Sequence, residues 1–122
     1  MKIAKITMYA NDQQLVKNWW VEKFGLEVTA ENQMGPNMTW IEVGAADQGV
    51  VMVIYDRKLM QQQNPNLPTT APHIMFSCSD AKAEYARLEA NGVEVFEFME
   101  MPYGTMFQFK DLEGNSFVVR QD

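Results

Sequence analysis

The sequence predicts an α+β fold in which two tandem β-α-β-β-β modules each form a mixed β-sheet with one helix. Two segments that lie 68 positions apart resemble each other: residues 6–12 read ITMYAND and residues 74–80 read IMFSCSD. Each is strand-like and ends in an Asp, which is suited to cap a following helix. A helical stretch follows in both halves, and Gly25 or Gly92 stands where it should end. This repeated order indicates an internal duplication.

The remaining elements follow in the same order in both halves. The strand-like segments are expected to lead into helices at 13–24 and 81–91, and then into short strands at 26–28 and 93–95. Two further strands complete each half, at 38–43 and 50–55 in the first and at 105–110 and 115–120 in the second.

The whole chain, 1–122, is expected to form a single domain. Its N-terminal module covers 1–56 and its C-terminal module covers 72–122. The segment between them, 57–71, contains the polar and proline-bearing run QQQNPNLP and is interpreted as a linker loop.

Composition excludes several classes of function. With 47% hydrophobic and 21% charged residues, the chain has enough apolar material for a core and no apolar run long enough for a membrane helix. Its net charge of −6, without a Lys/Arg cluster, is a poor match to nucleic acid. Cys78 is the only cysteine, so there is no internal disulfide. We expect a cytoplasmic protein that binds neither nucleic acid nor membranes.

Strand alternation separates a core face from a second face in each module. Phe76, Cys78, Phe117 and Val119 are expected in the core, and so is the Trp19–Trp20 pair. The second face mixes aromatic, methionine and polar side chains, which suits a ligand pocket better than bare solvent. Its expected members are Lys5, Thr7, Tyr9, Met38, Trp40, Glu42, His73, Met75, Val118 and Arg120.

Four motifs, in this order, resemble those of the vicinal oxygen chelate superfamily: WWVEKFG at 19–25, PHI at 72–74, YG at 103–104 and FKDLEGN at 109–115. That superfamily contains glyoxalase I, bleomycin-resistance proteins and extradiol dioxygenases. The last motif departs from the family's Asp-Pro-Asp-Gly-Asn at Leu112 and Glu113. The resemblance implies that the two modules form a cupped sheet around a pocket and that the protein is a homodimer.

In metal-dependent members of that superfamily, the ligands come from the first, fourth, fifth and eighth strands. The resemblance places these positions on Lys5, on Met52 or Val53, on His73 and on Val118. A protonated ammonium and apolar side chains cannot hold a divalent cation, and one histidine falls short of a catalytic site. We therefore expect no metal and no cofactor, which argues against the metal-dependent enzymes of the group.

The resemblance then implies a small-molecule binding protein of the antibiotic-resistance type, with a drug-like ligand in the sheet cavity. Tyr9 and Trp40 offer stacking surfaces, and Met38, Met52 and Met75 offer an adaptable apolar lining. The ligand's charge stays open, because Glu42 favours a cation, whereas Lys5, His73 and Arg120 favour an anion or simply reach solvent. The alternative is an enzyme in which His73 transfers a proton and Lys5 stabilises the developing anion.

Overall fold

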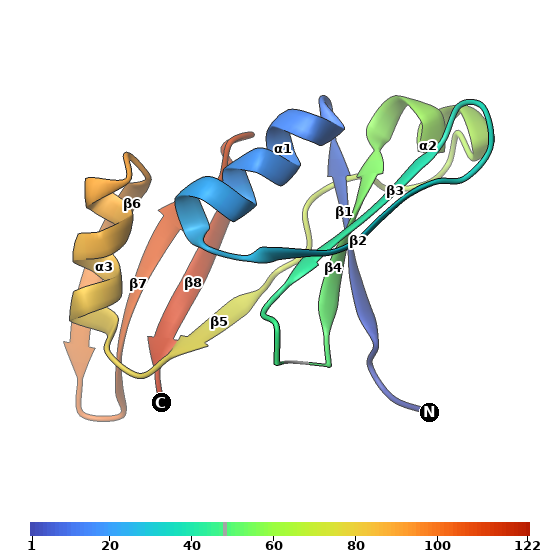
Figure 1. Ribbon diagram of the computed structural model, residues 1–122. Helices are drawn as coiled ribbons and strands as arrows, with labels where there is room; N and C mark the ends of the chain where they lie inside the picture. Colours follow the sequence, from blue (N-terminus) through green and yellow to red (C-terminus); the bar gives the residue numbers. More distant parts are fainter. Residues whose placement is uncertain (48) are drawn as a thin grey trace. The chain divides into compact units, whose positions relative to one another are not determined.

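The computed structural model describes residues 1–47 and 49–122, and the chain divides into two compact units, Met1–Pro72 and His73–Asp122 (Figure 1). Each unit holds a four-stranded mixed sheet, and three α-helices lie in the described part of the chain. The α+β class predicted from the sequence is therefore confirmed.

Unit 1 has the sheet order β1-β4-β3-β2, in which β1 pairs parallel to β4 and the other neighbours pair antiparallel. A right-handed helical segment connects β1 to β2, beginning as an α-helix and ending in one π-helical turn. The elements are β1 (Lys5–Ala10), α1 (Gln13–Trp19), η1 (Trp20–Phe24), β2 (Glu27–Gln33), β3 (Thr39–Gly44), β4 (Val51–Asp56) and α2 (Arg57–Gln63).

Unit 2 repeats this plan, with the sheet order β5-β8-β7-β6 and a parallel pairing of β5 with β8. Its single helix follows the first strand, as in unit 1. The same order of pairing in both sheets agrees with the duplication inferred from the sequence. The elements are β5 (Met75–Cys78), α3 (Ala81–Ala90), β6 (Glu94–Met101), β7 (Gly104–Lys110) and β8 (Ser116–Gln121).

Both predicted aspartate caps are present. The Asp12 side chain accepts a hydrogen bond from the Leu15 amide at 3.1 Å, and the Asp80 side chain accepts one from the Ala83 amide at 3.0 Å. These bonds satisfy amides of the first helical turn that have no partner within the helix.

The helix ends also follow the sequence prediction. Gly25 and Gly92 both take positive φ angles, 101° and 85°. The Gly25 amide donates to the Trp20 carbonyl at 3.0 Å, which closes the π-helical turn. A side chain at either glycine would strain the backbone, so these residues let the chain leave the helix and enter the next strand.

The predicted linker loop is wrong in its first half, because 57–63 forms the helix α2. The Asp56 side chain caps it by accepting from the Leu59 amide at 3.2 Å. The residues that follow are good helix formers, and the chain leaves the helix at Asn64, immediately before Pro65. The polar run therefore spans the end of a helix as well as a loop.

Each unit has its own hydrophobic core between its helix and one face of its sheet. Trp20 of η1 is fully buried in unit 1, as predicted, and its ring meets that of Phe24 at 5.1 Å. In unit 2 the Tyr85 ring of α3 packs edge-on against Phe107 of β7 at 5.3 Å. The buried hydrophobic residues are Met8, Ala10, Val16, Trp20, Ile41, Val43, Met52, Val53, Ile54, Ala81, Leu88, Val93, Phe107, Phe109, Phe117 and Val119.

Strand parity is as predicted in β5 and β8, but the depth of burial differs. Phe117 and Val119 are buried, whereas Phe76 and Cys78 are only half-buried. The Phe76 ring still contacts the core, with its centre 5.7 Å from that of Phe109. Burial raises the pKa of the Cys78 thiol, which fits a structural cysteine better than a reactive one.

The turn between β7 and β8 depends on Asp111, a buried carboxylate. It accepts hydrogen bonds from the Asn115 amide at 2.8 Å, the Asn115 side chain at 3.0 Å and the Glu113 amide at 3.1 Å. Gly114 has φ 85° in the same turn. Leu112 is 49% exposed, so the turn tolerates a residue other than proline there.

Candidate functional site

The face of the unit 1 sheet that points away from α1 carries most of the predicted site residues of that unit. Residues that are partners across neighbouring strands project to the same side of a sheet, so the pairing register assigns each side chain to a face. We call this surface the Tyr9 face. It consists of Lys5, Thr7, Tyr9, Trp40, Glu42, Val53 and Tyr55.

Three aromatic rings form a row across β1, β4 and β3 on this face. The rings of Tyr9 and Tyr55 lie 5.8 Å apart at an interplanar angle of 26°, and Trp40 meets Tyr55 edge-on at 5.6 Å. All three residues are half-buried, so part of each ring stays accessible. The row offers apolar ring surface and two phenol groups, with the Trp40 ring nearly perpendicular to the Tyr55 ring.

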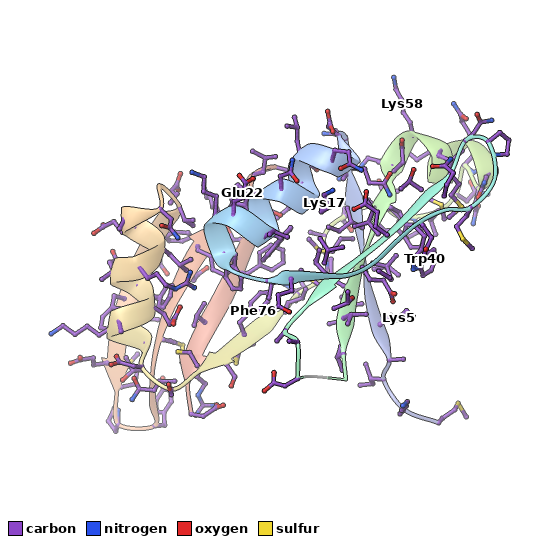
Figure 2. All side chains as sticks on the ribbon, in the orientation of Figure 1. Lys5, Lys17, Glu22, Trp40, Lys58 and Phe76 are labelled. Carbon is purple, nitrogen blue, oxygen red and sulfur yellow. The ribbon has the colours of Figure 1, made fainter. Side chains whose placement is uncertain are left out.

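An ion pair lies beside the aromatic row. The Lys5 ammonium on β1 donates to Glu42 Oε1 on β3, and the pair therefore crosses the central strand β4. Its two members differ in exposure: 46% of the Lys5 side chain is accessible but only 13% of the Glu42 side chain. Figure 2 labels Lys5, which lies on β1, and Trp40, which lies on β3.

Burial and the neighbouring Tyr9 phenol raise the pKa of Tyr55, while the Lys5 ammonium acts in the opposite direction. Both Tyr9 and Lys5 are thus close enough to influence the Tyr55 phenol. Its hydroxyl stays protonated at neutral pH and can donate a hydrogen bond.

The register decides between the two residues considered for the fourth strand. Met52 pairs with Ile6 and Val43 on the helix-covered face and is 5% exposed, so its expected place in the ligand lining is wrong. Val53 pairs with Thr7 and Glu42 and belongs to the Tyr9 face.

Met38 was predicted as a site residue of unit 1, whereas Tyr55 was not. Met38 is half-buried and precedes β3, where its carbonyl accepts from the Met34 amide at 2.7 Å. Tyr55 was missed by sequence reasoning, although strand alternation places it on the same face once Val53 is assigned there.

The corresponding face of unit 2 has a different character, rich in methionine. Two rows of partners cross the sheet from β5 through β8 and β7 to β6. We call it the Met75 face, after a side chain that is 59% exposed. One row is Met75, Val118, Gln108 and Phe96, and the other is Ser77, Arg120, Met106 and Met99.

Arg120 is held by the hairpin between β6 and β7. Its Nη2 donates to the Tyr103 carbonyl at 2.8 Å, and a Cβ added to Gly104 would lie 3.0 Å from Nε. The absence of a side chain at Gly104 therefore leaves room for the guanidinium beside it. Among the described residues, Nε is buried and has no hydrogen-bond partner.

The three cationic residues predicted for the site, Lys5, His73 and Arg120, are divided between the two units. Lys5 belongs to unit 1, where its charge is paired with Glu42. His73 and Arg120 belong to unit 2, and His73 is exposed just before β5. Of the three cations that could favour an anion or simply reach solvent, Lys5 is therefore already paired with a carboxylate.

Within residues 1–47 and 49–122, no group of three or more His, Cys, Asp or Glu side chains lies close enough together to hold a metal ion. No helix in the same residues has the length and apolar character that crossing a membrane requires.

The sequence is similar to a known protein family and to a protein of Bacillus subtilis. A family model described as Glyoxalase/Bleomycin resistance protein/Dioxygenase superfamily matches residues 2–119. The uncharacterized protein YetH of Bacillus subtilis (strain 168) is 34% identical over 121 residues, which cover 98% of both chains.

Solved structures share the fold. TnmS3, an antibiotic binding protein from Streptomyces sp. CB03234, is 25% identical with a TM-score of 0.81, covering 99% of this chain and 95% of its own. A superfamily member from Sphaerobacter thermophilus DSM 20745 has a TM-score of 0.85 at 21% identity, covering 100% and 98% of the two chains. At that identity the second likeness supports the fold alone.

Proposed function

The chain belongs to the glyoxalase/bleomycin resistance protein/dioxygenase superfamily, and from this premise we propose that it binds a small, planar, drug-like molecule on the Tyr9 face without catalysing a reaction. The aromatic row carries the proposal. Three half-buried rings from three strands, with centres 5.6–5.8 Å apart between neighbours, present a stacking surface away from the helix.

The related antibiotic binding protein supports a drug-like ligand. TnmS3 matches nearly the whole chain at 25% identity and is described as an antibiotic binding protein. By analogy, this chain would act in antibiotic resistance by sequestering a compound.

The residues at the superfamily's metal positions support a metal-independent role. The resemblance assigns these positions to Lys5, Met52 or Val53, His73 and Val118, of which only His73 is an ordinary metal ligand. Protein purified without added metal should contain none at stoichiometric level by elemental mass spectrometry. One equivalent of zinc, nickel or iron per chain would contradict this part of the proposal.

The alternative enzyme, with His73 as proton-transfer group and Lys5 as anion stabiliser, has weaker support. The Lys5 ammonium pairs with Glu42, so part of its charge is already neutralised. If a turnover assay ever reveals activity, loss of that activity in a His73→Ala variant would favour the enzyme over the binding protein.

A screen of planar aromatic compounds tests the main proposal. Binding should raise the melting temperature, since a ligand at about 100 times its Kd stabilises a protein by ~2.7 kcal/mol. Trp40→Ala and Tyr55→Leu should remove this shift. Leu15→Ala is the matched control, because Leu15 is an exposed apolar residue of α1. Binding that survives both face substitutions would overturn the proposal.

We also infer that modules 1–56 and 72–122, joined by 57–71, act as one domain in a cytoplasmic homodimer. Superfamily membership supports both parts. Light scattering after size-exclusion chromatography should give twice the mass of 14.0 kDa, and unfolding should occur in a single transition. A monomer, or two separate transitions, would contradict these inferences.

A further inference from the structure

We propose that the ligand of the Tyr9 face is a planar aromatic cation, and that its positive group takes the place of the Lys5 ammonium at the Glu42 carboxylate. This inference rests on the proposed binding function and adds the charge of the ligand to it. The sequence left that charge open, and the unequal exposure of Lys5 and Glu42 favours a positive charge.

The two members of the pair are unequal in their need for a partner. Glu42 is 13% exposed, so its carboxylate is largely removed from water and costs free energy when unpaired. Lys5 is 46% exposed on a flexible stem near the start of β1. Released from Glu42, the ammonium returns to water at little cost, because exposed ion pairs contribute little to stability.

An anionic ligand meets the opposite situation. To bind Lys5 it would have to separate that ammonium from Glu42, leaving a mostly covered carboxylate without a counter-charge. It would also approach that carboxylate closely, on a chain whose net charge is −6. Exchange of one cation for another avoids both costs.

The aromatic row favours the same charge. Trp40 lies two residues from Glu42 on the same face of β3, and Val53, the partner of Glu42, lies two residues from Tyr55 on β4. Ring faces attract cations through their quadrupole. A flat cation stacked on one accessible ring of the row can therefore place its charged edge at Glu42.

Val53 on the central strand β4 is 1% exposed, although it lies on the face away from α1. The Lys5–Glu42 pair joins the two strands on either side of β4 and therefore crosses it. Moving the Lys5 side chain away would expose apolar surface beside the rings. The exchange thus supplies both a counter-charge and an apolar contact.

Two probes of the same shape separate charge from stacking. Proflavine is a three-ring cation and acridone a neutral three-ring compound, and fluorescence titration measures the affinity of each. We expect proflavine to bind more tightly than acridone. Lys5→Met should strengthen proflavine binding about fivefold by removing the competing ammonium. Glu42→Gln should lower it toward that of acridone.

The chain offers matched controls on the helix side of the same sheet. Lys17 of α1 pairs with Glu31 of β2 at 3.0 Å, and Figure 2 labels Lys17 on the helix. Lys17→Met and Glu31→Gln change the net charge as the test variants do but leave the Tyr9 face intact. They should leave both affinities unchanged.

The outcomes distinguish the exchange of cations at Glu42 from the binding of a ligand to the aromatic row. Equal affinities for both probes, unaffected by Lys5→Met or Glu42→Gln but lost in Trp40→Ala, would overturn the cation exchange and leave the stacking surface standing. Binding of neither probe by the wild type would overturn both. A Lys5→Met variant that binds proflavine more weakly would also contradict the exchange.

Discussion

Tyr9 and Tyr55 lie side by side on the parallel neighbours β1 and β4, as a register pair whose rings are 5.8 Å apart. One comes from the first strand of unit 1 and the other from its last strand, so the pair forms only when these two distant segments come together. The stacking surface is therefore a product of tertiary structure and not of a local motif.

The Tyr55 phenol should titrate above its ordinary value of 10.0, chiefly because burial disfavours the phenolate. Lys5→Met should raise this pKa further, since it removes a nearby positive charge that lowers it. The difference in phenolate absorbance between each protein and its Tyr55→Phe counterpart reports this one titration. A lower pKa in Lys5→Met would contradict the placement of Lys5.

Asp111→Ala should destabilise the protein by about 1–3 kcal/mol, because two backbone amides and one side-chain amide lose their acceptor. Asp111→Asn keeps one acceptor oxygen and should cost less. Urea unfolding measures both. Leu112→Ala in the same turn is the control and should change stability by no more than about 0.5 kcal/mol.

The same carboxylate predicts a dependence of stability on pH. Burial raises the pKa of Asp111 above 3.8, so the folded state favours its protonated form. Relative to Asp111→Asn, the wild type should lose stability as pH rises from that ordinary value through the folded pKa. A gain over this interval would show that the turn's hydrogen bonds outweigh burial.

Gly104→Ala should be more harmful than Gly35→Ala. Both glycines have positive φ, 153° and 94°, but only at Gly104 would the new Cβ meet another residue, 3.0 Å from Arg120 Nε. We expect Gly104→Ala to cost about 0.5–1.5 kcal/mol more in the free energy of unfolding, because displacing the guanidinium breaks its hydrogen bond to the Tyr103 carbonyl. Equal costs would mean that Arg120 adapts freely.

Phe117→Ala should destabilise the protein by about 3–5 kcal/mol, because Phe117 is 2% exposed within the unit 2 core. Phe76→Ala should cost at least about 1 kcal/mol less, since that ring is half-buried and loses fewer contacts. Equilibrium unfolding in guanidinium chloride compares the two. A larger loss at Phe76 would contradict the observed burial.

The sequence was most informative where local chemistry decides structure. The caps Asp12 and Asp80 and the helix-ending residues Gly25 and Gly92 act on neighbouring backbone atoms, and all four behave as predicted. The helix α2 carried the same kind of signal in Asp56, but the polar composition of the segment hid it.

The candidate site was harder to predict because its central strand has no alternation. Met52, Val53 and Ile54 are all apolar and at most 5% exposed, as expected for a strand covered on both sides. Only the pairing register assigns them to faces. This ambiguity hid Tyr55, and with it the middle ring of the row.

Each half of the chain encloses a core of its own, so the side chains on the opposite face of its sheet can change while that core is kept. Two copies of one ancestral unit can then diverge in surface chemistry while keeping the same scaffold. Here one copy displays a Tyr-Tyr-Trp ladder and a salt bridge, and the other displays methionines and an arginine. Duplication has thus given this small protein two sheet surfaces of different chemistry on one scaffold.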